Sequence, residues 1–285
     1  MKTVTTDDGL ALVTQEWPAP GDGARGLVVL VHGLGEHCRR YDHVARRLNA
    51  EGFDVVGYDH RGHGHSPGPR GGMPADDSLC ADLGRVLRAA RTAFPGPVVL
   101  LGHSLGGLIA GRYVAEGLAQ RPAAWWQPVD ALVMSSPALD AGTNALQKLL
   151  LATVAPMLPN LAVNNGLKVD WVSRSEAVVK AYAADPLVHD RITGRLGMFV
   201  ARQGPAVIAA APRWKTPTLL MWAGADRCVA PAGSAAFAQA APKGVVTTRE
   251  WTGLFHEIFN EPEQDAVLDA MVAWLATLVP ERQPA

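Results

Sequence analysis

The sequence Leu100-Leu101-Gly102-His103-Ser104-Leu105-Gly106-Gly107 joins an apolar run to a predicted helix. Residues 98–101 predict a buried strand, and residues 108–114 predict the first turns of a helix. Between them stands the pattern G-x-S-x-G, whose glycines leave room for a tight turn at Ser104. A serine in such a turn can hold a strained backbone with its hydroxyl exposed. The stretch therefore predicts a nucleophile at the junction of a strand and a helix.

Strand and helix patterns alternate along most of the chain, which predicts an α/β fold with a mostly parallel sheet. A hairpin at its edge is expected from residues 3–6 and 10–17. The other predicted strands are 27–31, 54–58, 98–101, 129–134, 218–222 and 245–251, and the longer helices are 39–50, 76–92 and 263–278. From 138 to 212 the alternation lapses and apolar helical patches replace it. We therefore expect a core of residues 1–137 and 213–285 with a helical cap, 138–212, inserted into it.

The charge balance and the cysteines narrow the class of protein. Basic and acidic side chains number 26 and 27, giving a net charge of −1 at pH 7, so nucleic acid is not an expected partner. Cys38, Cys80 and Cys228 are widely spaced, which favours buried thiols over a disulfide framework. The first residues lack an apolar leader and no apolar run is long enough for a bilayer, so we expect a cytoplasmic location.

Three residues in separate loops carry the predicted chemistry. In an open α/β sheet, reactive groups lie in loops at the carboxyl ends of the strands. Ser104, Asp226 and His256 each follow a predicted strand, in the order Ser, Asp, His that is typical of this architecture. We predict that His256 takes the proton of the serine and that Asp226 orients the imidazole. Asp140 also follows a strand and is the competing acid.

The loop His32-Gly33-Leu34-Gly35 follows the strand 27–31 and can turn the backbone N–H of Leu34 toward the nucleophile. The N–H of Leu105 is the second predicted donor, because it begins a helix whose dipole favours negative charge. Together they predict an oxyanion hole. Taken alone, His32-Gly33 also fits an ordinary turn at the end of a strand.

A second glycine-rich loop, Asp59–Gly68, holds His60, His63 and His65 and raises the question of a metal site. A matching ligand set is missing downstream, and a glycine-rich loop does not fix ligand geometry. We therefore expect no metal there. Serine chemistry also needs no organic cofactor.

The predicted cap contains a strongly apolar stretch, residues 146–158, interrupted at Pro156. Such a stretch is typical of a protein core. Above the strand ends it also fits an acyl pocket or a transient contact with a membrane. The side chains predicted to bind the acyl chain are Leu150, Met157, Leu158 and Phe199.

Five segments together carry a resemblance to a known family. They are HGLGEH at 32–37, DHRGHGHS at 59–66, GHSLGG at 102–107, GADR at 224–227 and FHEIFNE at 255–261. With Asp185-Pro186-Leu187 in the predicted cap, they make nearly the whole chain similar to the monoacylglycerol lipase and lysophospholipase branch of the α/β-hydrolases. The first two segments in combination are specific to that branch.

The resemblance implies an eight-stranded, mostly parallel sheet flanked by helices and a helical cap over an apolar acyl tunnel. It supports the triad and the oxyanion donors named above. It also implies that Glu36 and Arg40 shape the polar end of the site, where glycerol would sit. The expected reaction is hydrolysis of a lipid ester, in the first place a monoacylglycerol, to glycerol and a fatty acid through an acyl-enzyme on Ser104.

Other substrates stay open at this point. Relatives with a second histidine three residues after the catalytic one use it near glycerol, whereas this chain has Phe259 there. A broad carboxylesterase or a lysophospholipase on the same scaffold therefore also fits. A non-catalytic receptor for a small molecule is a further alternative. A dehalogenase does not fit, because its nucleophile would be a carboxylate where Ser104 stands.

Overall fold

A mixed sheet runs through the computed structural model, which describes residues 1–21, 23–94 and 96–279. Its strands are β1 (Lys2–Thr5), β2 (Ala11–Trp17), β3 (Gly26–Val31), β4 (Phe53–Tyr58), β5 (Val98–His103), β6 (Ala131–Ser135), β9 (Thr218–Ala223) and β10 (Val246–Trp251). They form one eight-stranded sheet in the order β1-β2-β4-β3-β5-β6-β9-β10. β2 is antiparallel to both of its neighbours, and all other neighbours are parallel. The predicted sheet and its edge hairpin are confirmed.

The central strands are apolar because both of their faces are covered. Every residue of β3, β5, β6 and β9 is buried, as expected for parallel strands between two layers of helices. β10 stands at an edge, and its sequence Val246-Thr247-Thr248-Arg249-Glu250-Trp251 is largely exposed. Burial thus follows position in the sheet.

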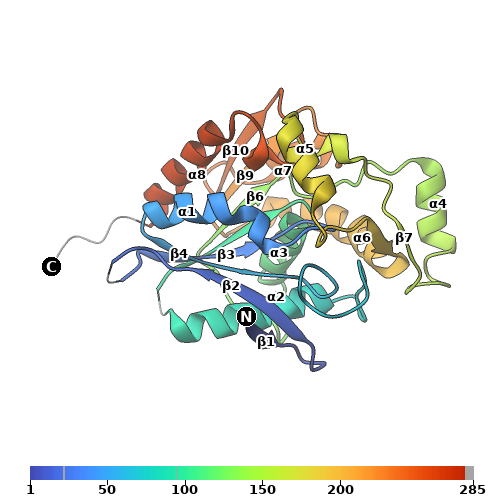
Figure 1. Ribbon diagram of the computed structural model, residues 1–285, viewed down its shortest axis with the longest axis horizontal. Coiled ribbons are helices and arrows are strands. Elements are labelled where there is room, and N and C mark those ends of the chain that lie inside the picture. The colour runs from blue at the N-terminus through green and yellow to red at the C-terminus, as the bar shows by residue number, and fades with distance from the viewer. Residues whose placement is uncertain (22, 95, 280–285) are drawn as a thin grey trace.

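Helices cover both faces of the sheet (Figure 1). α1 (Asp42–Ala50) and α8 (Gln264–Leu278) pack on one face, where Leu48 and Met271 join one buried cluster. α2 (Ser78–Ala93), α3 (Leu105–Glu116) and α7 (Pro231–Ala240) pack on the other, where Leu83 and Ile109 join a second cluster. The short helices η1 (Cys38–Tyr41) and η4 (Ile258–Asn260) lie in loops.

Between β6 and β9 the chain leaves the large sheet. This stretch holds α4 (Ala145–Thr153), β7 (Ala162–Asn164), η2 (Val169–Trp171), α5 (Glu176–Ala184), β8 (Arg191–Thr193), α6 (Gly194–Ala210) and η3 (Ala211–Arg213), with β7 and β8 paired in a small sheet of their own. Figure 1 shows α4 at the margin of the molecule, away from the large sheet. None of the described helices has the length and apolarity needed to cross a bilayer.

α6 and α4 relate to the main core in opposite ways. On α6, Leu196, Phe199 and Val207 belong to the buried cluster that contains α3. On α4, by contrast, Leu146, Leu149 and Leu150 are exposed, and the helix is begun by a capping box between Asn144 and Gln147. α6 lies within the predicted cap, residues 138–212, yet it packs in the main core. The division of the chain into a core and a cap at these residues therefore stays a prediction.

The turn after β5 holds Ser104 in a strained backbone conformation, with φ 55° and ψ −119°. Positive φ is unfavourable for a residue with a Cβ and persists only where the surroundings impose it. The adjacent glycines permit the turn: a Cβ on Gly102 would lie 2.4 Å from the Gly106 carbonyl oxygen, and one on Gly106 would lie 1.9 Å from the Val31 carbonyl oxygen. The close approach of backbone to backbone therefore requires glycine at both positions.

We expect Gly106→Ala to destabilise the fold, because its methyl group meets the backbone of β3, which cannot move aside. Overpacking of this kind costs about 1–3 kcal/mol or more, which thermal unfolding followed by circular dichroism would register as a fall in Tm of several degrees. Gly244→Ala is the matched control, since nothing lies within 4 Å of a Cβ built there. Equal Tm values for the two variants would contradict this account of the turn.

Candidate active site

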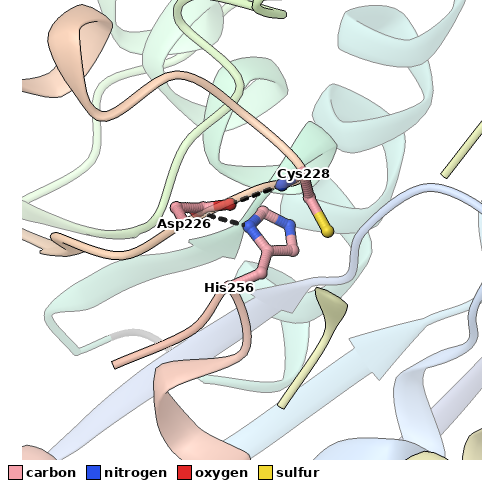
Figure 2. A group of neighbouring side chains, drawn as sticks. All are labelled: Asp226, Cys228 and His256. Atoms are coloured by element: carbon pink, nitrogen blue, oxygen red, sulfur yellow. Dashed lines mark hydrogen bonds and ion pairs between the residues drawn. The ribbon is translucent and has the colours of Figure 1, made fainter. Parts of the chain in front are cut away.

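The predicted triad residues meet at the carboxyl ends of β5, β9 and β10. His256 Nε2 lies 2.8 Å from Ser104 Oγ, and His256 Nδ1 lies 2.7 Å from Asp226 Oδ2. The other oxygen of Asp226 accepts hydrogen bonds from the backbone N–H groups of Cys228 (2.8 Å) and Val229 (3.1 Å). Figure 2 shows the aspartate joined by dashed lines to the imidazole and to the backbone nitrogen of Cys228. Serine, imidazole and carboxylate thus form one continuous hydrogen-bonded relay.

Burial and charge shift the pKa values of His256 and Asp226 in opposite directions. Burial alone would lower the pKa of His256, but the Asp226 carboxylate bound to its ring raises that pKa above the ordinary value of 6.5. Burial alone would likewise raise the pKa of Asp226, but the imidazole and the two backbone donors hold it below its ordinary value. The aspartate therefore stays ionised and favours a proton on His256.

The backbone N–H groups of Leu34 and Leu105, the predicted oxyanion donors, have differing surroundings: Leu34 lines the cavity beside Ser104, whereas Leu105 is buried and does not. Within the described residues, neither donates a hydrogen bond to the protein. Leu105 is the first residue of α3, where helical N–H groups lack an acceptor in their own helix. Leu34 lines the same cavity as Ser104, and the neighbouring Gly33 N–H is held by Glu36 Oε1 at 2.6 Å.

A cavity of about 240 Å³ opens beside Ser104. Segment 165–190 supplies most of its apolar lining and many of its polar side chains, and the loops after β3, β5 and β10 supply the other polar groups that surround Ser104. Its lining residues are Gly33, Leu34, Glu36, His103, Ser104, Asn165, Leu167, Lys168, Val169, Val172, Tyr182, Ala183, Asp185, Val188, His189, Asp190, Cys228, His256 and Glu257. The mixture of apolar and polar walls suits a ligand with one apolar and one polar part.

Glu36 and Arg40, expected at the polar end, are joined in a buried ionic network. Arg40 pairs with Glu36 through one nitrogen and with both oxygens of Glu257 at 2.7 Å. Its guanidinium also lies over the Tyr182 ring, 4.6 Å from the centroid. Burial alone would raise the pKa of Glu36, but Arg40 holds it below its ordinary value. Glu36 lines the cavity, whereas Arg40 supports it from behind.

The four residues expected at the acyl chain lie elsewhere. Leu150, Met157 and Leu158 are exposed, Met157 to 80%, and Phe199 packs in the main core. None of the four lines the cavity beside Ser104. Apolar periodicity finds an apolar face but does not say whether it meets a cavity, a core or solvent. The apolar lining comes instead from positions such as Leu167, Val169, Val172 and Val188, which no periodic pattern marks.

Asp140, the competing acid, and His103, the neighbour of Ser104 in sequence, both lie outside the relay. The exposed Asp140 accepts a hydrogen bond from the Gly142 N–H and is not the acid that contacts His256. His103 is buried, with Nδ1 3.0 Å from Ser135 Oγ and its ring 4.7 Å from that of His256. Burial, and then the nearby His256, lower the pKa of His103 to about 4, so it is a neutral neighbour of the relay.

In the described part of the chain, one group of side chains has the spacing of metal ligands, namely Asp226, Cys228 and His256 (Figure 2). The aspartate and the imidazole are already engaged with each other and with Ser104. Burial and the Asp226 charge raise the pKa of the Cys228 thiol, so the thiol stays protonated. The group is best described as the relay with a neutral thiol beside it.

Sequence reasoning missed three groups at this site, Glu257, Tyr182 and Glu261. Glu257 follows the predicted catalytic histidine directly, which is a signal that could have been used. Tyr182 stands three residues before Asp185 in the motif that carried the resemblance. Glu261 closes the segment FHEIFNE, and its contacts are described below.

Comparison with known proteins agrees with this geometry. A family model described as serine aminopeptidase, S33 matches residues 22–263. A monoacylglycerol lipase of Mycolicibacterium smegmatis is 35% identical over 94% of both chains, and phospholipase YtpA of Bacillus subtilis is 30% identical over 90% of this chain and 98% of its own. The crystal structure of Paleococcus ferrophilus monoacylglycerol lipase superposes with a TM-score of 0.81, at 36% identity, over 93% of this chain and 98% of that one.

The sheet, the strained serine turn and the relay define an α/β-hydrolase. Within that class the chain belongs to the serine aminopeptidase, S33 family and to its monoacylglycerol lipase branch. The resemblance inferred from the sequence motifs is thereby confirmed.

We expect Asp226→Asn to lower the pKa of His256, because burial remains while the largest of the carboxylate contributions that offset it is gone. NMR titration of the imidazole signals measures this directly, without any substrate. Asp140→Asn, which removes the exposed acid after β6, should leave the His256 pKa unchanged. A His256 pKa that is the same in Asp226→Asn as in the parent protein would refute the coupling.

Proposed function

We propose that this protein hydrolyses lipid esters, in the first place monoacylglycerols, through an acyl-enzyme on Ser104. The observation that carries the proposal is the unbroken relay Ser104–His256–Asp226, at 2.8 and 2.7 Å, on the wall of the cavity. Similarity to two monoacylglycerol lipases, at 35% and 36% identity, supports the choice of substrate.

The reaction proceeds in two halves. Ser104 Oγ attacks the ester carbonyl as His256 takes its proton, and the N–H groups of Leu34 and Leu105 hold the negative oxygen of the intermediate. His256 then gives the proton to the oxygen of the departing alcohol, and the acyl group stays on Ser104. In the second half a water adds to the acyl carbon, gives its proton to His256, and the fatty acid leaves as the proton returns to Ser104.

The lining of the cavity suits the two parts of a monoacylglycerol. Leu167, Val169 and Val172 give an apolar wall for the acyl chain, and Glu36 and Asp185 are among the polar groups that face the alcohol. In this proposal segment 138–212 acts as the cap, because its residues 165–190 contribute half of the lining or more. Arg40 keeps Glu36 ionised and in place.

A lysophospholipid is the second candidate substrate, favoured by the 30% identity to a phospholipase. Phe259 is buried and its carbonyl accepts a hydrogen bond from His43, so this position offers no imidazole to glycerol. Rates on monoacylglycerols, lysophospholipids and simple alkyl esters, compared at matched acyl length, separate the three substrate classes. Preference for the alkyl esters would point to a broad carboxylesterase.

A cytoplasmic location stays part of the proposal. The three cysteines are all buried and unpaired, as is usual in a reducing compartment.

Ser104→Ala and His256→Ala should each lower turnover of a short p-nitrophenyl ester by about a thousandfold or more, since each removes an essential part of the relay. Circular dichroism should show an unchanged fold. A fluorophosphonate probe should label the parent protein at Ser104 and fail to label Ser104→Ala. If the folded parent protein neither reacts with the probe nor hydrolyses the ester, a non-catalytic receptor is the better description.

We further propose that the apolar surface around α4 contacts the membrane from which substrate is drawn. Apart from Met1 and Leu278, the exposed large apolar side chains of the described chain all lie between Leu146 and Leu167. Leu167 belongs both to this surface and to the cavity lining. Leu167 therefore connects this surface to the cavity beside Ser104.

Replacing Leu146, Leu149 and Met157 together by serine should weaken binding to phosphatidylcholine vesicles about tenfold or more, because three exposed apolar side chains no longer enter the lipid. Cosedimentation measures the binding. Turnover of a short soluble ester should be unchanged, because these residues lie outside the cavity. Leu278→Ser, an exposed leucine on α8, is the matched control. Undiminished vesicle binding by the triple variant would exclude this surface as the contact.

A further inference from the structure

The loop that carries His256 is held in place from one side by a single buried carboxylate. Glu261 follows η4, five residues after His256, and its side chain is 0% exposed. The backbone N–H of Phe255, the residue before His256, donates to Glu261 Oε2 at 3.1 Å. The ring of Phe255 lies under the guanidinium of Arg227, the residue after Asp226, at 4.9 Å. Phe255 is therefore fixed between Glu261 and the aspartate loop.

The same carboxylate also binds the segment that forms one wall of the cavity. Ser173 Oγ and the Arg174 backbone N–H donate to Glu261 Oε1 at 2.7 and 2.6 Å, and Arg174 Nε donates to Oε2. One residue earlier, Val172 lines the cavity, and its carbonyl accepts the Glu257 N–H at 2.8 Å. Wall and catalytic loop thus meet at Glu261.

Four donors converge on this carboxylate, two on each oxygen, so only an ionised acid satisfies all of them. Burial alone would raise the pKa of Glu261, but the Arg174 guanidinium and the other donors hold it below its ordinary value. A glutamine in place of Glu261 would turn its NH₂ group, which is itself a donor, toward two of these donors. At least one side of the junction would then lose its hydrogen bonds.

We propose that Glu261 is a positioning residue that sets the place of His256 between Ser104 and Asp226 and joins it to the cavity wall at Val172–Arg174. It does not touch the reacting atoms. Since an error of about 1 Å in the placement of a catalytic group can cost about a hundredfold in rate, the effect of Glu261 falls on turnover. The inference rests on the proposed hydrolase function for its kinetic readout.

The test compares Glu261→Gln with the parent protein on p-nitrophenyl butyrate, with active sites counted by the end point of fluorophosphonate labelling. We expect kcat per labelled site to fall about tenfold or more, with a smaller change in KM, because a short acyl group makes little use of the wall. The acidic limb of kcat/KM should move to lower pH, since a looser contact with Asp226 raises the His256 pKa less.

Glu263→Gln is the matched control. Glu263 also pairs with Arg174, but it is exposed and contacts no backbone N–H of the His256 loop. This variant should keep the parent kcat and the parent pH profile. An equal loss of kcat in both variants would mean that kcat depends on the ion pairs of Arg174 and not on the hydrogen bond between Glu261 and the Phe255 N–H. That result would overturn the proposal.

A purely structural role has a different signature. If Glu261→Gln lowers Tm but keeps the parent kcat per labelled site and the parent acidic limb, the proposal is wrong. If Glu261→Gln does not fold, Ser173→Ala takes its place, because it removes one wall-side donor and leaves the Phe255 contact. It should lower kcat in the same direction by about twofold to fivefold, and an unchanged kcat would contradict the proposal.

Failure of the hydrolase function itself would be seen separately, as a parent protein that does not turn over the ester. The NMR-derived pKa of His256 needs no substrate and still tests the positioning role in that case. It should be lower in Glu261→Gln than in the parent protein and in Glu263→Gln, and equality among the three would refute the role of Glu261.

Discussion

The buried contact between Asp226 and His256 is the interaction on which the rest of the site depends. An imidazole withdrawn from water is a poor proton acceptor, because its charged form has lost its hydration. Asp226 offsets that loss only if it is itself ionised in the same dry place. The backbone N–H groups of Cys228 and Val229 provide for this by donating to its second oxygen. The loop after β9 thus stabilises the ionised Asp226. Asp226 in turn raises the basicity of His256, which lies in the loop after β10.

Such electrostatics are useful only if the three loops are held rigidly, and the sheet supplies that rigidity. The Ser104 N–H donates to the Ser135 carbonyl at 2.9 Å, which ties the strained turn to β6. Ser136, the other non-glycine residue with positive φ in the described chain, is tied to β9 through the Met221 carbonyl at 2.8 Å. The strained conformation of Ser104 is therefore maintained by the buried strands β6 and β9 and by the close backbone packing at Gly106. Strain of this kind survives only in a well-packed surrounding.

The sequence predicted the parts of this structure that follow a recognisable strand, and it did not predict the contacts made by irregular segments. The sheet, the serine turn and the residues that meet in the relay all follow strands whose apolar runs are plain to read. The acyl contacts could not be read in the same way: Leu150 and Met157 lie on an apolar face that meets solvent, while Val172 lines the cavity from an irregular segment. Glu261 escaped notice because its partners Ser173 and Arg174 lie between η2 and α5, in an irregular segment that no periodic pattern marks.

The negative charges around the relay have opposite effects on two events of the proposed reaction, the uptake of a proton by His256 and the formation of the negative oxygen. Three carboxylates, those of Asp226, Glu36 and Glu257, raise the pKa of His256, and the Arg40 guanidinium balances one of them. This negative surrounding favours the step in which His256 takes a proton. It opposes the negative oxygen of the intermediate, and in the proposed mechanism the backbone donors at Leu34 and Leu105 offset this repulsion over a short distance. The same field repels a fatty acid once it is released and ionised. A site built in this way accepts a neutral ester, passes a proton efficiently and favours departure of its own anionic product.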